Sequence, residues 1–424
     1  MRKKDDNGIS RRTFLKRSVV GLGTLTFAGA PTLLRAQQAP IKIGAVIPLS
    51  GNYGFLGASV RCGMAQAIDE FNSKGGLLGR KIEVVEEDCA TDAALSIRKA
   101  QRLLQAEKVN FFASAGGSSV CAAMADFGKK EGVIVMSVDP NSDILTGEKA
   151  NRFFFQVPPV NYQIAHTIAP YVAQHLGKKW YYFTHDYSWG WTLTESCRKF
   201  MRENGAQEVG ESKIPLNTRD FSSFLLKVRG AKPEVVMVNV AGADFTAMVE
   251  QMYEFGLHKI AKIVIPLEDF EDAWTVGPEK NSIFTLMGVE WHYTIPGVPG
   301  IKEHVEKYKK LFPRPVYPVP TTNSFNTYMG VRELLRAVER TGTLDAPKVI
   351  KAMEGHVVKD SLKHDPLTIR EWDHQFVQDF YYFRPKKNMK EWTDIFEYVG
   401  YGKGMDNAVT RTLSKAKMEK LPGE

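Results

Sequence analysis

The chain has 424 residues, and 56 Lys and Arg against 48 Asp and Glu give it a formal net charge of +8. Eight of these basic residues and two of the acidic ones lie in residues 1–36, so the rest carries 48 basic and 46 acidic side chains. This balance excludes the basic surface that nucleic-acid binding requires, and we expect no nucleic-acid partner. A remainder of roughly 390 residues usually forms two domains.

The first 36 residues have the pattern of an export signal. "SRRTFLK" at 10–16 contains the arginine pair of a twin-arginine leader, and an apolar stretch at 19–30 follows it. The stretch is shorter than the roughly 20 residues that span a bilayer, so a membrane anchor is the less favoured interpretation. We predict export to the periplasm by the twin-arginine pathway, with the signal peptide cleaved after Ala36.

Beyond the leader, apolar strand-like runs alternate with helical patterns. The runs predict strands at 41–49, 81–86, 109–113, 132–138, 180–184, 234–240 and 262–266. Apolar stripes with helical spacing lie between them, at 60–71, 93–104, 193–200 and 245–252. This alternation indicates parallel sheets covered by helices on both faces, in two series at 41–157 and 158–285 that join near 153–161.

After residue 285 the pattern is less regular. Proline-rich connections precede a predicted helix at 321–341, and 368–370 and 378–383 are expected to form late strands. The charged end at 401–424 is predicted to be a mobile tail. Because open parallel sheets bind ligands beyond the carboxyl ends of their strands, two such lobes would share one binding cleft.

A glycine-rich turn, "AGGSS" at 115–119, stands between a predicted strand and a helix. Its backbone N–H groups and the positive end of the helix favour an anion, with Ser118 or Ser119 adding a hydroxyl. The alternative is that Ser118 only caps the helix. The turn lacks the dinucleotide-binding spacing, and the chain has no phosphate loop or nucleophile elbow. We therefore expect no cofactor and no enzymatic activity.

Metal and disulfide sites are only weakly indicated. We interpret four scattered His and Asp residues in a loop-rich stretch as solvated side chains rather than metal ligands: His364, Asp365, Asp373 and His374. Four cysteines are too few for a disulfide scaffold. Cys89 and Cys121, both near strand ends, are the pair that could form one bridge; the alternative is that they are unpaired.

Several segments, in this order along the chain, resemble the Leu/Ile/Val-binding proteins, the type I periplasmic solute receptors of ABC importers. They are "PLSG" (48–51), "FNSKGGLLGRKIEV" (71–84), "ADFGKKEGV" (125–133), "HDYSWG" (185–190), "QMYEFGL" (251–257) and "NTYMGVRELLRAVERTGTLD" (326–345). The resemblance implies two doubly wound Rossmann-like lobes with parallel sheets, joined by crossing hinge strands. It also implies a monomer that binds a small-molecule solute and partners an ABC permease and its ATPase. We assign 37–157 and about 286–365 to lobe 1, and 158–285 and about 366–400 to lobe 2.

The resemblance also implies a ligand site. The family holds the ligand carboxylate at the turn that matches Gly117, Ser118 and Ser119, with further contacts from positions matching Asp139 and Asn141. An aromatic from the second lobe corresponds to Trp189, and the acid that receives the ligand ammonium corresponds to Glu268. The loop after the first strand would contribute Tyr53 or Phe55, and Gly242 replaces a tyrosine of the family.

The resemblance is compatible with several classes of ligand. A branched-chain or other hydrophobic amino acid is the first choice. The changes at Asp139, Asn141 and Gly242 keep amides, urea-like compounds and aromatic or short-chain carboxylates as alternatives. Two other functions also remain as alternatives: a ligand sensor for a membrane signalling partner, and an exported enzyme.

Overall fold

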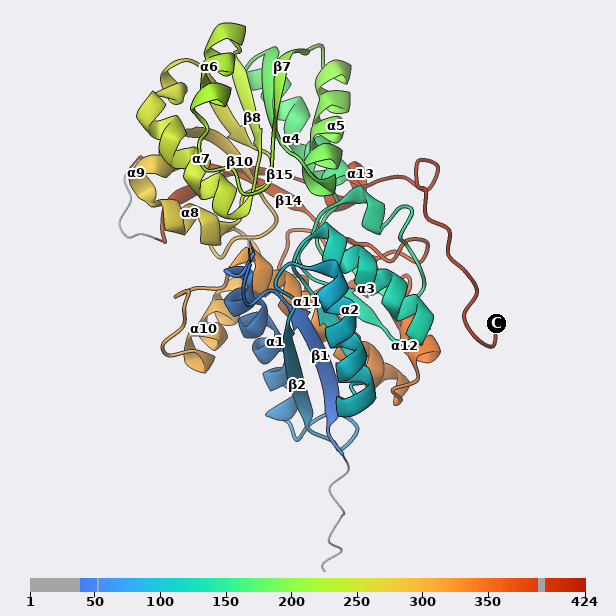
Figure 1. Cartoon of the computed structure of the whole chain (residues 1–424). Helices are drawn as coiled ribbons and strands as arrows, with labels where there is room; N and C mark the ends of the chain where they lie inside the picture. Colours follow the sequence, from blue (N-terminus) through green and yellow to red (C-terminus); the bar gives the residue numbers. More distant parts are fainter. Residues whose placement is uncertain (1–38, 52, 388–392) are drawn as a thin grey trace, which may run out of the picture. The chain divides into compact units, whose positions relative to one another are not determined.

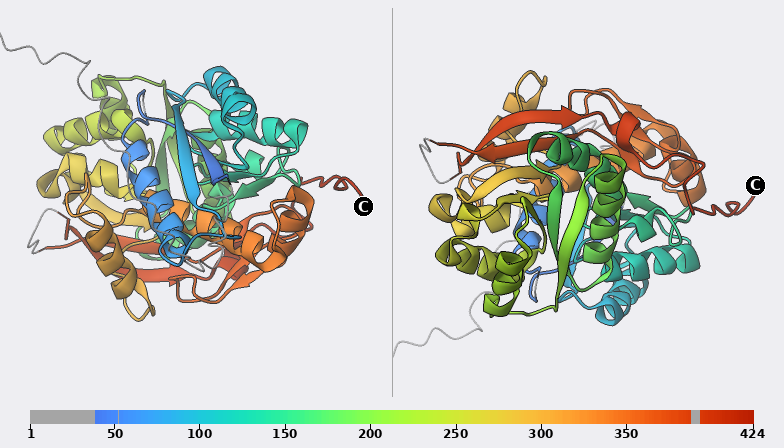
Figure 2. Two further views of the ribbon diagram at one scale, coloured as in Figure 1. Left: turned by 90° about the horizontal axis from the view of Figure 1, so that it is seen from below. Right: turned by 90° about the horizontal axis from the view of Figure 1, so that it is seen from above.

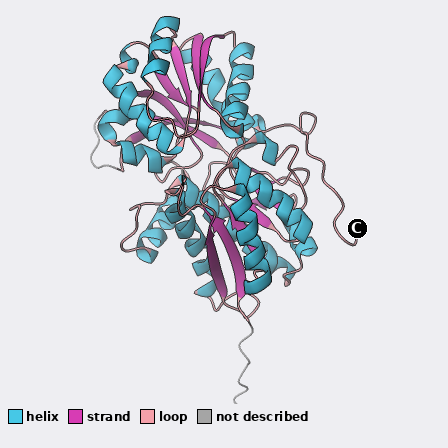
Figure 3. Cartoon of the chain, in the orientation of Figure 1, coloured by secondary structure: helices cyan, strands magenta, loops and turns pink. Residues whose placement is uncertain are grey.

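The computed structural model describes residues 39–51, 53–387 and 393–424. The predicted leader and its cleavage point lie outside the described residues. Within residues 39–424, two open sheets have helices on both faces, and a small antiparallel sheet accompanies them (Figures 1 and 3). This is the α/β class with two lobes that the alternation of strands and helices predicts.

The first sheet has the order β2-β1-β3-β4-β5, and all its pairs are parallel. Its strands are β1 (Ile41–Ile47), β2 (Ile82–Asp88), β3 (Phe111–Ser114), β4 (Val135–Ser137) and β5 (Phe154–Gln156). The helices of this lobe are α1 (Leu56–Asn72), α2 (Ala93–Arg102), α3 (Ser118–Glu131), α10 (Ile301–Leu311), α11 (Thr322–Thr341) and α12 (Ala346–Met353). Short helical turns cover Leu103–Glu107 and Asp143–Leu145.

Side chains of β1 explain why both faces of this sheet are covered. Ile43 and Ala45 belong to one apolar cluster with residues of α1 and α11, whereas Val46 belongs to another with residues of α2 and α3. Successive strand residues point to opposite faces, so a strand buried on both faces is apolar throughout. The run "IKIGAVI" has this composition.

The second sheet has the order β15-β14-β10-β9-β8-β6-β7. Its strands are β6 (Lys179–His185), β7 (Gln207–Ile214), β8 (Val235–Asn239), β9 (Lys262–Ile265), β10 (Phe284–Val289), β14 (Phe380–Pro385) and β15 (Phe396–Gly402). The helices of this lobe are α4 (Asn161–His175), α5 (Ser188–Glu203), α6 (Ser222–Ala231), α7 (Gly242–Phe255), α8 (Phe270–Val276), α9 (Pro278–Asn281) and α13 (Gly404–Asn407), with a turn at Leu257–Lys259. Tyr182 packs in one cluster with residues of α4 and α5, and Tyr181 in another with residues of α6 and α7.

Several elements differ from the sequence-based expectation. Strands β5, β7, β10 and β15 were not predicted, and β14 and β15 run antiparallel to their neighbours at one edge of the second sheet (Figure 2). Strand β10 pairs with β9, so it lies in the second sheet, although the assigned first lobe resumed at about 286. Strand β15 reaches Gly402 and α13 contacts α4, so the start of the segment predicted as a mobile tail has regular structure.

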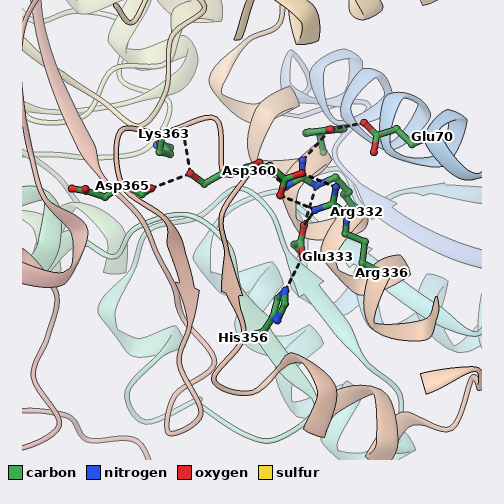
Figure 4. A network of polar contacts seen from close by, with 10 residues as sticks. Glu70, Arg332, Glu333, Arg336, His356, Asp360, Lys363 and Asp365 are labelled. Atoms are coloured by element: carbon green, nitrogen blue, oxygen red, sulfur yellow. Dashed lines mark hydrogen bonds and ion pairs between the residues drawn. The ribbon is translucent and has the colours of Figure 1, made fainter. Parts of the chain in front are cut away.

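A polar network in the first lobe ties α11 to the small sheet of β11 (Val357–Val358), β12 (Leu367–Ile369) and β13 (Phe376–Val377). Glu333 Oε1 accepts hydrogen bonds from Arg332 Nε at 2.9 Å and from Arg336 at 3.0 Å (Figure 4). Asp360, two residues after β11, pairs with both arginines. The network therefore fixes the loop after β11 against the long helix.

Three further properties concern the described residues only. No helix among residues 39–51, 53–387 and 393–424 has the length and apolar character to cross a membrane. Within the same ranges, no group of three or more His, Cys, Asp or Glu is arranged to hold a metal ion. All four cysteines are free, so Cys89 and Cys121 are unpaired; the thiol of Cys121 instead contacts Ser114.

Candidate functional site

Loops of both lobes line one small cavity of about 30 Å³. Its lining residues are Tyr53, Gly117, Ser118, Asp139, Pro140, Asn141, Tyr187, Trp189, Ala241, Leu267 and Asp269. Each of them follows the carboxyl end of a parallel strand, namely β1, β3, β4, β6, β8 or β9. This is the edge at which open α/β sheets bind ligands. The fold therefore places six of the ten predicted residues around one space: Tyr53, Gly117, Ser118, Asp139, Asn141 and Trp189.

The glycine-rich turn already holds a carboxylate. Asp139 Oδ2 accepts hydrogen bonds from the backbone N–H groups of Gly116 and Gly117, both at 3.0 Å. The two glycines have φ angles of 115° and 93°, a backbone conformation that residues with a side chain rarely adopt. In this conformation both N–H groups point toward Asp139, which follows the end of β4. From the family resemblance we expected the Gly117 N–H to bind a ligand carboxylate, whereas in the structure it donates to Asp139.

Burial raises the pKa of Asp139, although the two backbone hydrogen bonds act in the opposite direction.

Ser118 and Ser119 lie in different surroundings. Ser118 is 1% exposed, and its hydroxyl has no hydrogen-bond partner among the described residues. The cap of α3 is Gly117, so Ser118 is not the capping side chain that we considered as an alternative. Ser119, one residue further along the helix, is exposed and does not line the cavity. A buried hydroxyl without a partner is costly unless another group satisfies it, so Ser118 has hydrogen-bonding capacity that the described residues do not use.

Aromatic side chains from the two lobes meet at the cavity. The hydroxyls of Tyr53 and Tyr187 hydrogen-bond to each other, and the Tyr187 ring stacks on Trp189 with centroids 6.0 Å apart. Tyr187 was not predicted, although it stands within the "HDYSWG" segment two residues before Trp189. Phe55 lies against Tyr53, with centroids 6.2 Å apart, but does not line the cavity.

The acid facing the cavity is Asp269 rather than the predicted Glu268. Asp269 lines the cavity, and its Oδ1 accepts a hydrogen bond from Asn323 at 3.1 Å. Glu268 is 2% exposed and lines a smaller adjoining space of about 10 Å³ together with Asp272, and its Oε1 has no partner among the described residues. Burial, reinforced by neighbouring carboxylates, raises the pKa of both Glu268 and Asp269 well above the ordinary values.

Gly242 and Asn141 shape the site from its edges. Gly242 is the first residue of α7 and has a φ angle of 69°, and its N–H donates to Asp272 Oδ2 at 2.9 Å. Gly242 itself does not line the cavity; its neighbour Ala241 does. Asn141 Nδ2 donates to the Pro159 carbonyl at 2.7 Å and to the Glu290 carboxylate. Asn141 thus connects the first lobe to the chain segments that follow β5 and β10.

Comparison with known proteins gives one consistent result. A family model described as periplasmic binding protein matches residues 40–390. A Leu/Ile/Val-binding protein homolog 7 of Brucella abortus (strain 2308) is 27% identical over 342 residues, which cover 76% of this chain and 83% of that protein.

Solved structures agree in fold. An amino acid ABC transporter substrate-binding protein from Pseudomonas fluorescens Pf-5 has a TM-score of 0.81 at 22% identity, covering 89% of this chain and 99% of that one. A solute binding protein of an ABC transporter from Rhodopseudomonas palustris BisB5, in complex with 3,4-dihydroxy benzoic acid, has a TM-score of 0.74 at 22% identity, covering 86% and 98%. At these identities the likeness establishes the fold.

Proposed function

Since the chain belongs to the periplasmic binding protein family, we propose that it is the extracytoplasmic solute receptor of an ABC importer. It captures a small solute between its lobes and delivers it to a membrane permease that an ATPase drives. The observation that carries this proposal is the cavity at the carboxyl ends of the strands, to which both lobes contribute side chains. The twin-arginine leader would export the chain as a folded monomer, with cleavage after Ala36.

The site is suited to holding a molecule without changing it. The buried Ser118 hydroxyl provides a polar contact, and the stacked rings of Tyr187 and Trp189 provide a flat apolar surface. Asp269 provides an acceptor for an ammonium or amide group. The hydrogen bond between Tyr53 and Tyr187 joins the two lobes across the cavity and favours the closed form.

Binding then closes the receptor in the manner of a hinge. A solute that contacts Asp139 of the first lobe and Asp269 of the second gains both interactions only when the lobes are together. Closure excludes water and strengthens each hydrogen bond to the solute. Solute binding thereby stabilises the closed form, which is the form that the permease recognises. Asn141, bound to the connecting segments, is placed to respond to this movement.

The ligand is proposed to be a small solute with a nitrogen-bearing polar end. Hydrophobic amino acids, amides and urea-like compounds meet this description. Aromatic acids do not carry nitrogen, but the rings of Tyr187 and Trp189 keep them as an alternative. A thermal-shift screen of these four classes on the mature chain tests the proposal. We expect at least one class to raise the melting temperature, and small-angle scattering to report a more compact protein with that solute. Turnover of a solute, or no change of shape with any solute at saturation, would contradict a receptor function.

A further inference from the structure

We propose that the solute of this site carries no carboxylate, and that its polar end is an N–H donor: an amine, an amidine or an amide. This inference rests on the proposed receptor function and names the ligand class of the same cavity. It follows from the position of Asp139, the charges of the cavity walls and two buried oxygens without partners.

The first step concerns the anion seat of the glycine-rich turn. The Gly116 and Gly117 N–H groups already donate to one oxygen of Asp139. A ligand carboxylate at this place would have to displace Asp139 or lie beside it. Displacement leaves the Asp139 carboxylate without its two donors, and side-by-side placement brings two negative groups together. The turn therefore disfavours the group that it was expected to bind.

The second step concerns the charges around the cavity. Asp139 lies on the first-lobe wall and Asp269 on the second-lobe wall, while Glu268 and Asp272 line the adjoining space. Within the described part of the chain, no Lys, Arg or His lines either space. An anionic ligand would meet acidic side chains from both lobes and no compensating cation. A positively charged or N–H-rich ligand meets acceptors on both sides.

The third step concerns buried acceptors. Ser118 Oγ and Glu268 Oε1 are both covered from solvent and have no hydrogen-bond partner among the described residues. An ionised or neutral carboxyl oxygen and a hydroxyl oxygen both accept from N–H groups. Since buried polar atoms are usually paired, these two oxygens are available to accept hydrogen bonds from the N–H groups of a ligand. The Tyr187 and Trp189 rings add a surface that attracts cations and planar amidines alike.

Matched solute series test the ligand class on the unaltered protein. The first series is leucine, leucinamide and 3-methylbutylamine, and the second is benzoate, benzamide and benzamidine. Within each series the body is kept and only the polar end changes. We expect calorimetry to give at least about tenfold tighter binding of the best carboxylate-free member than of its carboxylate counterpart. Equal or tighter binding of leucine or benzoate would overturn the inference and leave the receptor function standing.

Two variants test the role of Asp139. Asp139→Ala releases the N–H groups of Gly116 and Gly117, so we expect leucine or benzoate to gain about tenfold in affinity and the preference to shrink. Asp143→Asn is the control, because Asp143 also accepts a backbone N–H, from Tyr162 at 2.9 Å, but does not line the cavity. This control should keep the wild-type preference. An unchanged preference in Asp139→Ala would overturn the inference, and binding of no solute by any of the three proteins would overturn the receptor function with it.

Discussion

Replacing Glu333 by glutamine should destabilise the first lobe. Glu333 is fully buried in α11, and its Oε1 accepts from Arg332 Nε and from Arg336, as Figure 4 shows. Arg332 is itself only 2% exposed. In Glu333→Gln the neutral amide oxygen can still accept hydrogen bonds, but the charge that balances the buried guanidinium is gone.

The size of the expected loss in the free energy of unfolding depends on which ion pairs remain in Glu333→Gln. Breaking a buried ion pair by removing one partner costs about 3–5 kcal/mol. Asp360 still pairs with Arg332 at 3.5 Å and with Arg336 at 2.7 Å, so part of the charge balance is kept. We therefore expect the lower end of that range, a loss of about 3 kcal/mol in the free energy of unfolding.

Urea unfolding followed by tryptophan fluorescence measures this loss. Glu339→Gln is the matched control, since Glu339 lies on the same helix but is exposed, and surface changes usually stay within about 0.5 kcal/mol. If Glu333→Gln were as stable as Glu339→Gln, the buried network would not stabilise the lobe and the reasoning would be refuted.

Three further predictions concern the cavity. Ser118→Ala should weaken the best solute by roughly tenfold in calorimetry, since one hydrogen bond to the ligand is lost; an unchanged affinity removes Ser118 from the site. Asp269→Asn should weaken amines more than neutral amides, and more than Glu268→Gln does; equal losses would contradict the ammonium role. Burial raises the pKa of Asp272 to about 7, so the folded form holds a proton that the unfolded form releases. Stability should thus fall from about pH 4 to about pH 7, and Asp272→Asn should flatten this fall in thermal melts.

Of the missed strands in the two large sheets, β5, β7 and β15 lie at an edge and β10 lies inside, whereas the edge strand β2 was predicted. Strands such as β1 and β8 are apolar because helices cover both of their faces. Strand β7, at the edge of the second sheet, reads "QEVGESKI" and is partly exposed along most of its length. A strand half in water carries charged residues, so its composition resembles that of a loop. Strand β15, at the other edge, is also partly exposed at residues 397–402, but it reads "FEYVGYG" and has a single charged residue.

The structure brings most of the predicted loops to one cavity, but it differs from the expectation in which side chains face that cavity. The strand pattern locates the turn with Ser118, and the family resemblance adds the positions of Asp139 and Trp189; all three residues line one cavity. Which of two neighbouring residues faces that cavity depends on backbone torsion within the turn. Asp269 and Glu268 are adjacent acids, and only the fold shows that the first faces the main cavity and the second the space behind it.

The role of Asp139 shows why a local motif does not determine its own ligand. The glycine turn and the helix start favour an anion. Strand β4 pairs with β3, and Asp139 lies two residues beyond the end of β4, so its carboxyl group reaches the turn that follows β3. A charge-assisted hydrogen bond contributes about 1.5–3 kcal/mol, and Asp139 makes two of them. A ligand carboxylate that replaced Asp139 would gain these bonds only by removing them from Asp139, so the exchange yields little net affinity. A solute that donates N–H groups leaves both bonds in place and adds new ones to the acids of the two walls. We therefore expect the hydrogen bonds from the Gly116 and Gly117 N–H groups to Asp139 to determine the selectivity of the cavity.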